Sequence, residues 1–235
     1  MEKKCMMVVT AHPDDADFGC SASVAKFSRK GWDVVYVICT DGSKGTEDRN
    51  IKPKELSKMR YDEQKNSGKV LGLRDVVFLN YPDGYLEPSL DVRKDISRQI
   101  RIWKPEILIT TNPTRDLNNS TYLGHPDHFA AGEATLSAVF PSARDHLTFP
   151  DLFEKENLEP HKVKEVWIMT YGETADFWNP VSEIDVDTSI EALLKHVSQI
   201  PDPQGAASWM KKRRQNLGGN IDSDFAESFK RFIMN

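Results

Sequence analysis

Short apolar runs rich in β-branched residues recur along this chain, and a stretch of helical length follows each of the first four. Such runs are typical of buried strands in a parallel sheet with amphipathic helices between them. The alternation predicts an α/β fold, a Rossmann-like and mostly parallel sheet with helices on both faces. The runs are MMVVTA (6–11), DVVYVICT (33–40), DVVFLN (75–80), EILITTN (106–112) and VWIMTY (166–171).

Apolar residues three and four positions apart predict helices later in the chain. The spacing of Phe225, Phe229 and Phe232 predicts one final helix. Stretches rich in Gly, Pro, Asn and Asp predict loops over 41–53, 113–124 and 141–162. Two further helical stripes are Val92, Ile96, Ile100 with Trp103, and Ile190, Leu193, Leu194 with Val197.

Composition narrows the class of protein. A chain of 235 residues with 39% hydrophobic content can bury a core of its own, and the absence of repeats or linkers predicts a single domain over 1–235. The net charge of −5, without a basic stripe, argues against nucleic acid as a partner. No apolar run approaches the roughly 20 residues of a membrane span. Three scattered cysteines and no secretory signal predict a cytoplasmic protein.

Directly after the first run the chain reads HPDDAD, which contains His12, Asp14, Asp15 and Asp17. One acid would suffice to stabilise a helix start, so this density of acids indicates chemistry rather than capping alone. A second cluster follows the fourth run and begins a helix that extends to about Val139. Its potential ligands are His125, Asp127 and His128. Ligands of open α/β sheets bind at the carboxyl ends of the strands, so we expect the two clusters to meet there.

The spacing of these residues points to a metal. His12 and Asp15 are three positions apart, as are His125 and His128, and this spacing can aim two side chains the same way. Two imidazoles and one carboxylate leave a coordination position open for water, as in catalytic zinc sites. Cys20 and Cys39 are expected to be small buried residues, because thiolate ligands are typical of closed structural sites.

The chain resembles the LmbE-like, PIG-L-like family of zinc-dependent N-deacetylases, whose members act mainly on N-acetylglucosamine-type amides. The resemblance rests on AHPDDADFGCSASVAKFSRKG, TDGSKGT, HPDHFAAGEA and IEALLKHVSQ in this order. It implies one zinc ion per chain held by His12, Asp15 and His128. An N₂O site of this kind also tolerates Fe²⁺ or Co²⁺.

The resemblance also implies roles in catalysis. Asp14 would be the general base, and His125 would stabilise the oxyanion or protonate the leaving amine. Asp127 would orient His125 and stabilise its charge. Hydrolysis of an amide independently requires such an arrangement, with water activated on one side and the departing amine protonated on the other.

Two further residues are expected to bind substrate. The resemblance places Arg60 and Asp83 where the family contacts sugar hydroxyls, and a guanidinium fork with a carboxylate can grip a sugar ring. A solvated pair of Arg60 with Glu63 on a helix face is the alternative for the first. Simple turn chemistry in YPDG is the alternative for the second.

The sequence departs from the family pattern at two places. Asp17 stands where many relatives have Glu, and Leu123 stands where some have Tyr, with Tyr122 beside it. KHVSQ has a structural role in one interpretation. In the other, His196 or Gln199 reaches the pocket.

These observations predict a metal-dependent hydrolase that removes an N-acetyl or similar acyl group from an amino sugar or glycoconjugate. An amidase of the same fold, acting on a thiol conjugate or an antibiotic intermediate, is the main alternative. A non-catalytic sugar- or metal-binding protein is the second. A nicotinamide enzyme is disfavoured because no G-x-G-x-x-G follows the first strand. Family members often assemble into trimers or hexamers, so the resemblance implies a homo-oligomer. The composition does not determine the oligomeric state.

Overall fold

The structure is a computed structural model and describes residues 3–117, 121–170 and 174–234. Its centre is a seven-stranded sheet of order β3-β2-β1-β4-β5-β7-β6. The strands are β1 (Cys5–Thr10), β2 (Asp33–Thr40), β3 (Asp75–Tyr81), β4 (Ile107–Thr110), β5 (Glu165–Met169), β6 (Phe177–Pro180) and β7 (Ala226–Ile233). The first five are parallel, and β7 runs antiparallel to both β5 and β6. The predicted α/β class and mostly parallel sheet are thus confirmed.

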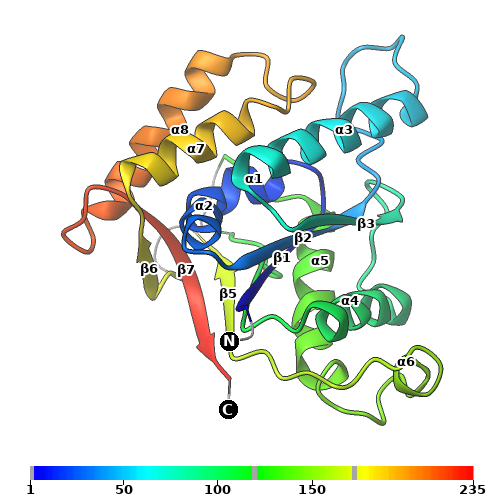
Figure 1. The fold of residues 1–235 in the computed structure, drawn as a ribbon. Coiled ribbons are helices and arrows are strands. Elements are labelled where there is room, and N and C mark those ends of the chain that lie inside the picture. Colours follow the sequence, from blue (N-terminus) through cyan, green and yellow to red (C-terminus); the bar gives the residue numbers. More distant parts are fainter. Residues whose placement is uncertain (1–2, 118–120, 171–173, 235) are drawn as a thin grey trace.

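Helices cover both faces of the sheet (Figure 1). They are α1 (Asp15–Gly19), α2 (Ser21–Arg29), α3 (Pro53–Leu71), α4 (Leu90–Trp103), α5 (Pro126–Ser137), α6 (Asp151–Glu154), α7 (Glu183–Leu193) and α8 (Pro203–Gly218), with a π-helical segment η1 (Ala138–Ser142). α4, α5 and α6 lie on one side together with η1, and α1, α2, α3, α7 and α8 lie on the opposite side. Two short elements, the end of η1 and α6, interrupt the stretch 141–162 that was expected to be a loop.

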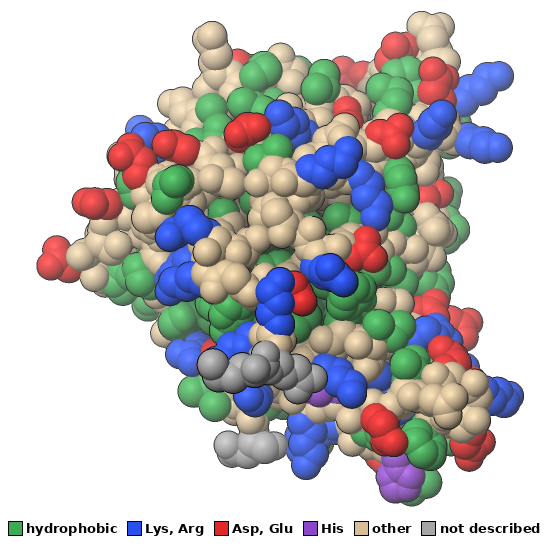
Figure 2. All heavy atoms as spheres, viewed as in Figure 1, with side chains coloured by type: hydrophobic (Ala, Val, Ile, Leu, Met, Phe, Trp, Pro, Cys, Tyr) green, Lys and Arg blue, Asp and Glu red, His purple; other side chains and the backbone are tan. Residues whose placement is uncertain are grey.

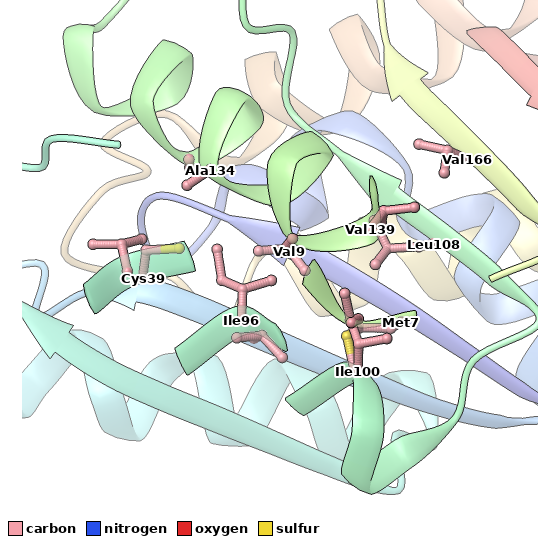
Figure 3. Close-up of a cluster of buried hydrophobic side chains, with 14 of the residues drawn as sticks. Met7, Val9, Cys39, Ile96, Ile100, Leu108, Ala134, Val139 and Val166 are labelled. Carbon is pink, nitrogen blue, oxygen red and sulfur yellow. The ribbon is translucent and has the colours of Figure 1, made fainter. Parts of the chain in front are cut away.

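Alternating side chains of the central strands supply the two cores, because successive residues of a strand point to opposite faces. Met7 and Val9 pack with Ile96 and Ile100 of α4 and with the alanines of α5 (Figure 3). Met6, on the other face of β1, joins the cluster beneath α1, α2, α3 and α7. Burial on both faces explains why these strands read as continuous apolar runs.

The prediction of a helix at the carboxyl-terminal end was wrong: this segment is strand β7. Its backbone pairs with β5 on one side and β6 on the other, which satisfies the free edge of β5. Phe229 is fully buried against Trp167, whereas Phe232 is 44% exposed. Tertiary pairing overrides the helical spacing of the phenylalanines.

The remaining differences are small. α7 ends at Leu193, so Val197 of the expected stripe lies beyond it and is exposed. Tyr171, at the end of the fifth predicted strand, lies outside the described residues. On the face shown in Figure 2, acidic and basic side chains are interspersed. Within the described part of the chain, no helix combines the length and apolar character needed to cross a membrane.

Candidate metal and catalytic site

The two His-Pro-Asp motifs lie at the point where the connections of the sheet reverse direction. β1 pairs with β2 on one side and with β4 on the other, so the loops after β1 and β4 leave from neighbouring strands. This topological switch point is the usual ligand site of an open α/β sheet. Residues 12–15 and 125–128 therefore meet although more than 100 positions separate them.

The backbone of the first motif is strained at Asp14, which has a φ of 96° in the left-handed region. Non-glycine residues pay about 1–2 kcal/mol to adopt this conformation, which aspartate and asparagine adopt more readily than most. Asp14 occupies the N-cap position of α1, but its side chain makes no capping hydrogen bond. The structure therefore does not support a role for this carboxylate as a helix cap.

A tight approach of α5 to β4 sets the position of the second motif. A Cβ atom on Gly132 would lie 2.5 Å from the carbonyl oxygen of Thr111, so only glycine permits this approach. The hydroxyl of Thr111 donates to the carbonyl oxygen of His128 at 2.7 Å. His125 is the N-cap of α5, and its Nδ1 accepts a hydrogen bond from the amide of Asp127 at 3.2 Å.

Asp15 joins the two motifs. One of its carboxylate oxygens lies 3.0 Å from Nε2 of His128, and the other lies 3.5 Å from Nδ1 of His12. Burial acts to raise the pKa of Asp15, but His128 and His12 outweigh it and hold this pKa well below its ordinary value. The pKa of each histidine is raised by the same pairing, against the effect of burial. The residues predicted as metal ligands thus form one contiguous cluster.

Other imidazoles and carboxylates adjoin this cluster. The rings of His12 and His125 stand edge to face with centroids 4.6 Å apart. Among the described residues, two groups offer three ligand atoms within 4.8 Å of one another: His12, His125 and His128, and His12, Asp83 and Asp127. The structure therefore has histidine and aspartate groups able to bind a metal ion.

The charge balance also fits a divalent cation. Four carboxylates gather within and beside the cluster, namely those of Asp14, Asp15, Asp83 and Asp127. A permanent cation, the guanidinium of Arg60, lies 3.4 Å from Asp14 and 3.8 Å from Asp83. Buried negative charge needs compensation, which a divalent ion would supply.

The contacts of Asp127 differ from the expected ones. Oδ1 of Asp127 lies 4.0 Å from Nδ1 of His125, which is too long for a hydrogen bond. It lies instead 3.2 Å from Nε2 of His12 and accepts hydrogen bonds from the amides of Gly84 and Leu86. Asp127 is thus placed to orient His12, in the way that carboxylates orient the far nitrogen of a metal-bound histidine.

Asp83 lies on the same side of His12. Its Oδ1 is 3.2 Å from Nε2 of His12, and its Oδ2 accepts from the amide of Lys44 at 2.9 Å. Burial raises the pKa of Asp83, but the hydrogen bond and charge of His12 prevail and lower it to about 2. Asp83 therefore does more than shape a turn.

Arg60 is buried rather than displayed to a ligand. Its guanidinium donates to the carbonyl oxygens of Pro13 at 2.7 Å and Lys44 at 3.0 Å. The solvated pair with Glu63 does not form, because Arg60 is only 4% exposed and Glu63 binds Ser198. In this arrangement Arg60 ties the first motif to the loop after β2.

The carboxylate of Asp14 lies 3.4 Å from the guanidinium of Arg60. Burial raises the pKa of Asp14 to about 6, although Arg60 acts to lower it. Burial lowers the pKa of His125, and the nearby His12 lowers it further. Its Nδ1 is occupied as the acceptor of the Asp127 amide, which leaves Nε2 as the nitrogen that can donate.

Sequence reasoning missed Gln64 of α3, which is fully buried and bonded to the amide of Asp14. Its sequence context, a glutamine within a polar helix, carries no distinguishing signal. His196 of KHVSQ is also fully buried and reaches Asp17. Tyr122 and Leu123 are 58% and 74% exposed.

Fold and site together define an α/β protein with a histidine and aspartate cluster at its switch point. The chain belongs to the PIG-L family: the family profile, described as GlcNAc-PI de-N-acetylase, matches residues 7–139. It is 31% identical over 199 residues to a diacetylchitobiose deacetylase of Thermococcus kodakarensis, covering 85% of this chain and 71% of that protein.

Two further proteins are similar. The solved structure of N,N'-diacetylchitobiose deacetylase from Pyrococcus horikoshii has a TM-score of 0.86 at 26% identity, covering 99% of this chain and 85% of that one. A mycothiol S-conjugate amidase of Streptomyces coelicolor is 29% identical over 182 residues, covering 67% of this chain and 59% of that protein.

Proposed function

We propose that this protein is a metal-dependent hydrolase that removes the N-acetyl group from an N-acetylglucosamine-type sugar or glycoconjugate. The observation that carries the proposal is the meeting of the two motifs through Asp15, beside a carboxylate, Asp14, that caps no helix. The relatives named as deacetylases of diacetylchitobiose support the choice of a small amino-sugar substrate.

His12, Asp15 and His128 would hold one zinc ion, with Fe²⁺ or Co²⁺ as substitutes. When bound, such an ion supplies Lewis-acid activation of water and of the amide carbonyl. Asp83 and Asp127 fix the ring of His12 from its far nitrogen, so that Nδ1 remains directed toward Asp15.

Asp14 and His125 account for the proton transfer and the hydrogen bonding during hydrolysis. Asp14 accepts a proton from the attacking water. His125 then donates a hydrogen bond from Nε2 to the oxygen that becomes negative as the amide is attacked. The proton held by Asp14 is next available to the leaving amine, which must be protonated before the C–N bond breaks.

Arg60 has a supporting role in this proposal. Its contacts with Pro13 and Asp14 hold the first motif in place, and contact with a sugar hydroxyl remains a prediction for it and for Asp83. The single domain over 1–235, the cytoplasmic location and a homo-oligomeric state also remain predictions.

A deacetylation screen tests the function. Purified zinc-loaded protein would be assayed for acetate release from N-acetylglucosamine, diacetylchitobiose, and inositol and malate conjugates of N-acetylglucosamine. Chelated protein and the Asp14→Asn variant serve as controls. Release of acetate from at least one substrate, abolished by both controls, is expected. Zinc-loaded protein that releases no acetate from any of these compounds contradicts the proposal.

The similarity to a mycothiol S-conjugate amidase supports a second candidate function, hydrolysis of an amide in a thiol conjugate. The same screen separates it when an amide of a mycothiol S-conjugate is included. Cleavage of that amide together with no acetate release would favour the amidase.

A further inference from the structure

Asp14 is held in its strained conformation by a residue of another element. Gln64 of α3 accepts a hydrogen bond from the amide of Asp14 through Oε1 at 2.9 Å, and it donates from Nε2 to Oδ2 of Asp17 at 2.9 Å. The orientation of its side-chain amide is fixed, because an N–H can only donate and a carboxylate can only accept. Turning this amide over would oppose donor to donor and acceptor to acceptor.

A buried histidine completes the chain of contacts. Nε2 of His196 lies 2.8 Å from Oδ2 of Asp17, and both side chains are fully buried. The loop of His196 is itself tied to α3, since Ser198 donates to both carboxylate oxygens of Glu63 at 2.7 Å. Contacts thus run from the loop after α7, through Asp17 and Gln64, to the backbone of Asp14.

A contribution to stability alone does not explain this series of contacts. Within the described structure, Oδ1 of Asp17 and Nδ1 of His196 are buried without a hydrogen-bond partner. Each such atom costs about 1–3 kcal/mol, so an apolar replacement of similar shape would serve packing better. What the three side chains do fix is the backbone amide of the one residue of the motif with a positive φ.

We propose that Gln64, Asp17 and His196 are positioning residues that lock the left-handed backbone of Asp14 and thereby aim its carboxylate. The proposal rests on the proposed function, in which Asp14 is the general base. The three side chains form a relay of hydrogen bonds, and Gln64 is the member in direct contact with Asp14.

The first test is independent of activity. Hydrogen exchange of the Asp14 amide would be measured in the wild type and in Gln64→Met, which keeps the size of the side chain and removes both hydrogen bonds. Ser67→Ala is the matched control, because Ser67 is fully buried on the same helix and its hydroxyl is unpartnered in the described structure. Faster exchange in Gln64→Met alone is expected. Unchanged protection of the Asp14 amide in Gln64→Met would overturn the proposal.

The second test is a double-mutant cycle on turnover. Misplacing a catalytic group by about 1 Å costs up to about 100-fold in rate, so Gln64→Met should lower kcat about 10- to 100-fold with little change in KM or metal content. In the Asp14→Asn background the same change should have almost no further effect, because no base remains to be aimed. Equal losses of kcat in both backgrounds would show that Gln64 only supports the fold. An inactive wild type would count against the proposed function, and the exchange experiment would still decide the relay.

The third test exchanges the amide and the carboxylate of Gln64 and Asp17 and measures the recovery of kcat. Gln64→Glu places two carboxylates against each other and should lower kcat, whereas adding Asp17→Asn restores a donor opposite an acceptor. The free Nδ1 of His196 can take up the ring proton and leave Nε2 as the acceptor. Recovery of most of the lost kcat in the double variant is expected, and no recovery contradicts the relay.

Discussion

Replacing Asp14 by asparagine separates the chemistry of this residue from its place in the fold. The change keeps the shape of the side chain and removes its ability to accept a proton. Loss of a positioned general base costs about 10²–10⁴-fold in rate, which corresponds to about 3–5 kcal/mol of activation free energy. We therefore expect kcat to fall by that factor.

The same substitution should cost little stability. Asparagine is among the residues that best tolerate a positive φ, so the backbone of Asp14 at 96° suits it as well as aspartate. Arg60 keeps its carbonyl partners, Pro13, Gly42 and Lys44, when the charge of Asp14 is removed. Asp14→Ala, in contrast, should lower the melting temperature because alanine lacks this tolerance.

The assay compares three properties of the purified variants: kcat, metal content by elemental analysis, and melting temperature. Asp14→Asn should change only the first. The neighbouring Asp15→Ala should lower metal content and kcat together, because it removes the carboxylate that bridges His12 and His128. If Asp14→Asn kept most of the activity while holding its metal, Asp14 would not be the base.

Three further substitutions test other parts of the structure. His128→Ala should lower metal content and activity together by elemental analysis and kinetics, and full metal content would contradict the ligand assignment. Phe229→Ala should lower the free energy of unfolding by about 3–5 kcal/mol in denaturant, while exposed Phe232→Ala should change it far less; equal effects would refute the packing of β7. Asp185→Asn should cost about 1 kcal/mol at neutral pH, chiefly because a neutral amide oxygen replaces the carboxylate in the capping box, since solvent screens the partner Arg29. Burial raises the pKa of Asp185, but hydrogen bonds led by that of Arg29 outweigh it and lower this pKa. The contribution of Asp185 to stability is therefore present above about pH 4, the ordinary pKa of aspartate, and should vanish as pH falls through the lowered value. A constant difference in unfolding free energy between wild type and Asp185→Asn from pH 7 to pH 2 would contradict this prediction.

The sheet could be predicted from the sequence to the extent that its strands are buried on both faces. β1 and β2 are apolar at nearly every position, so their runs identify them without any knowledge of their neighbours. β7 is different, because it contains charged residues. Glu227 is buried in it as the partner of Arg214, and Lys230 and Arg231 follow later in the strand. Only the open edge of β5 makes that segment extended, and the edge is a property of the assembled sheet.

The site shows the same division. Strand ends predict that the two motifs meet, since the connections fix which loops are neighbours. The partners of Asp127 could not be predicted in this way, because they are the backbone amides of Gly84 and Leu86. Every residue has such an amide, so no residue type in the sequence marks the ones that will face a carboxylate.

The neighbouring carboxylates of Asp14 and Asp15 illustrate why residue type alone does not determine role. α1 begins at Asp15, whose side chain contacts the histidines, while the left-handed backbone one residue earlier leaves Asp14 in contact with Arg60. The pKa values of two identical side chains thus shift in opposite directions: His128 and His12 lower that of Asp15, and burial raises that of Asp14. Since the backbone of Asp14 adopts an angle that costs about 1–2 kcal/mol, the residues that hold this angle are proposed to matter as much as the carboxylates themselves.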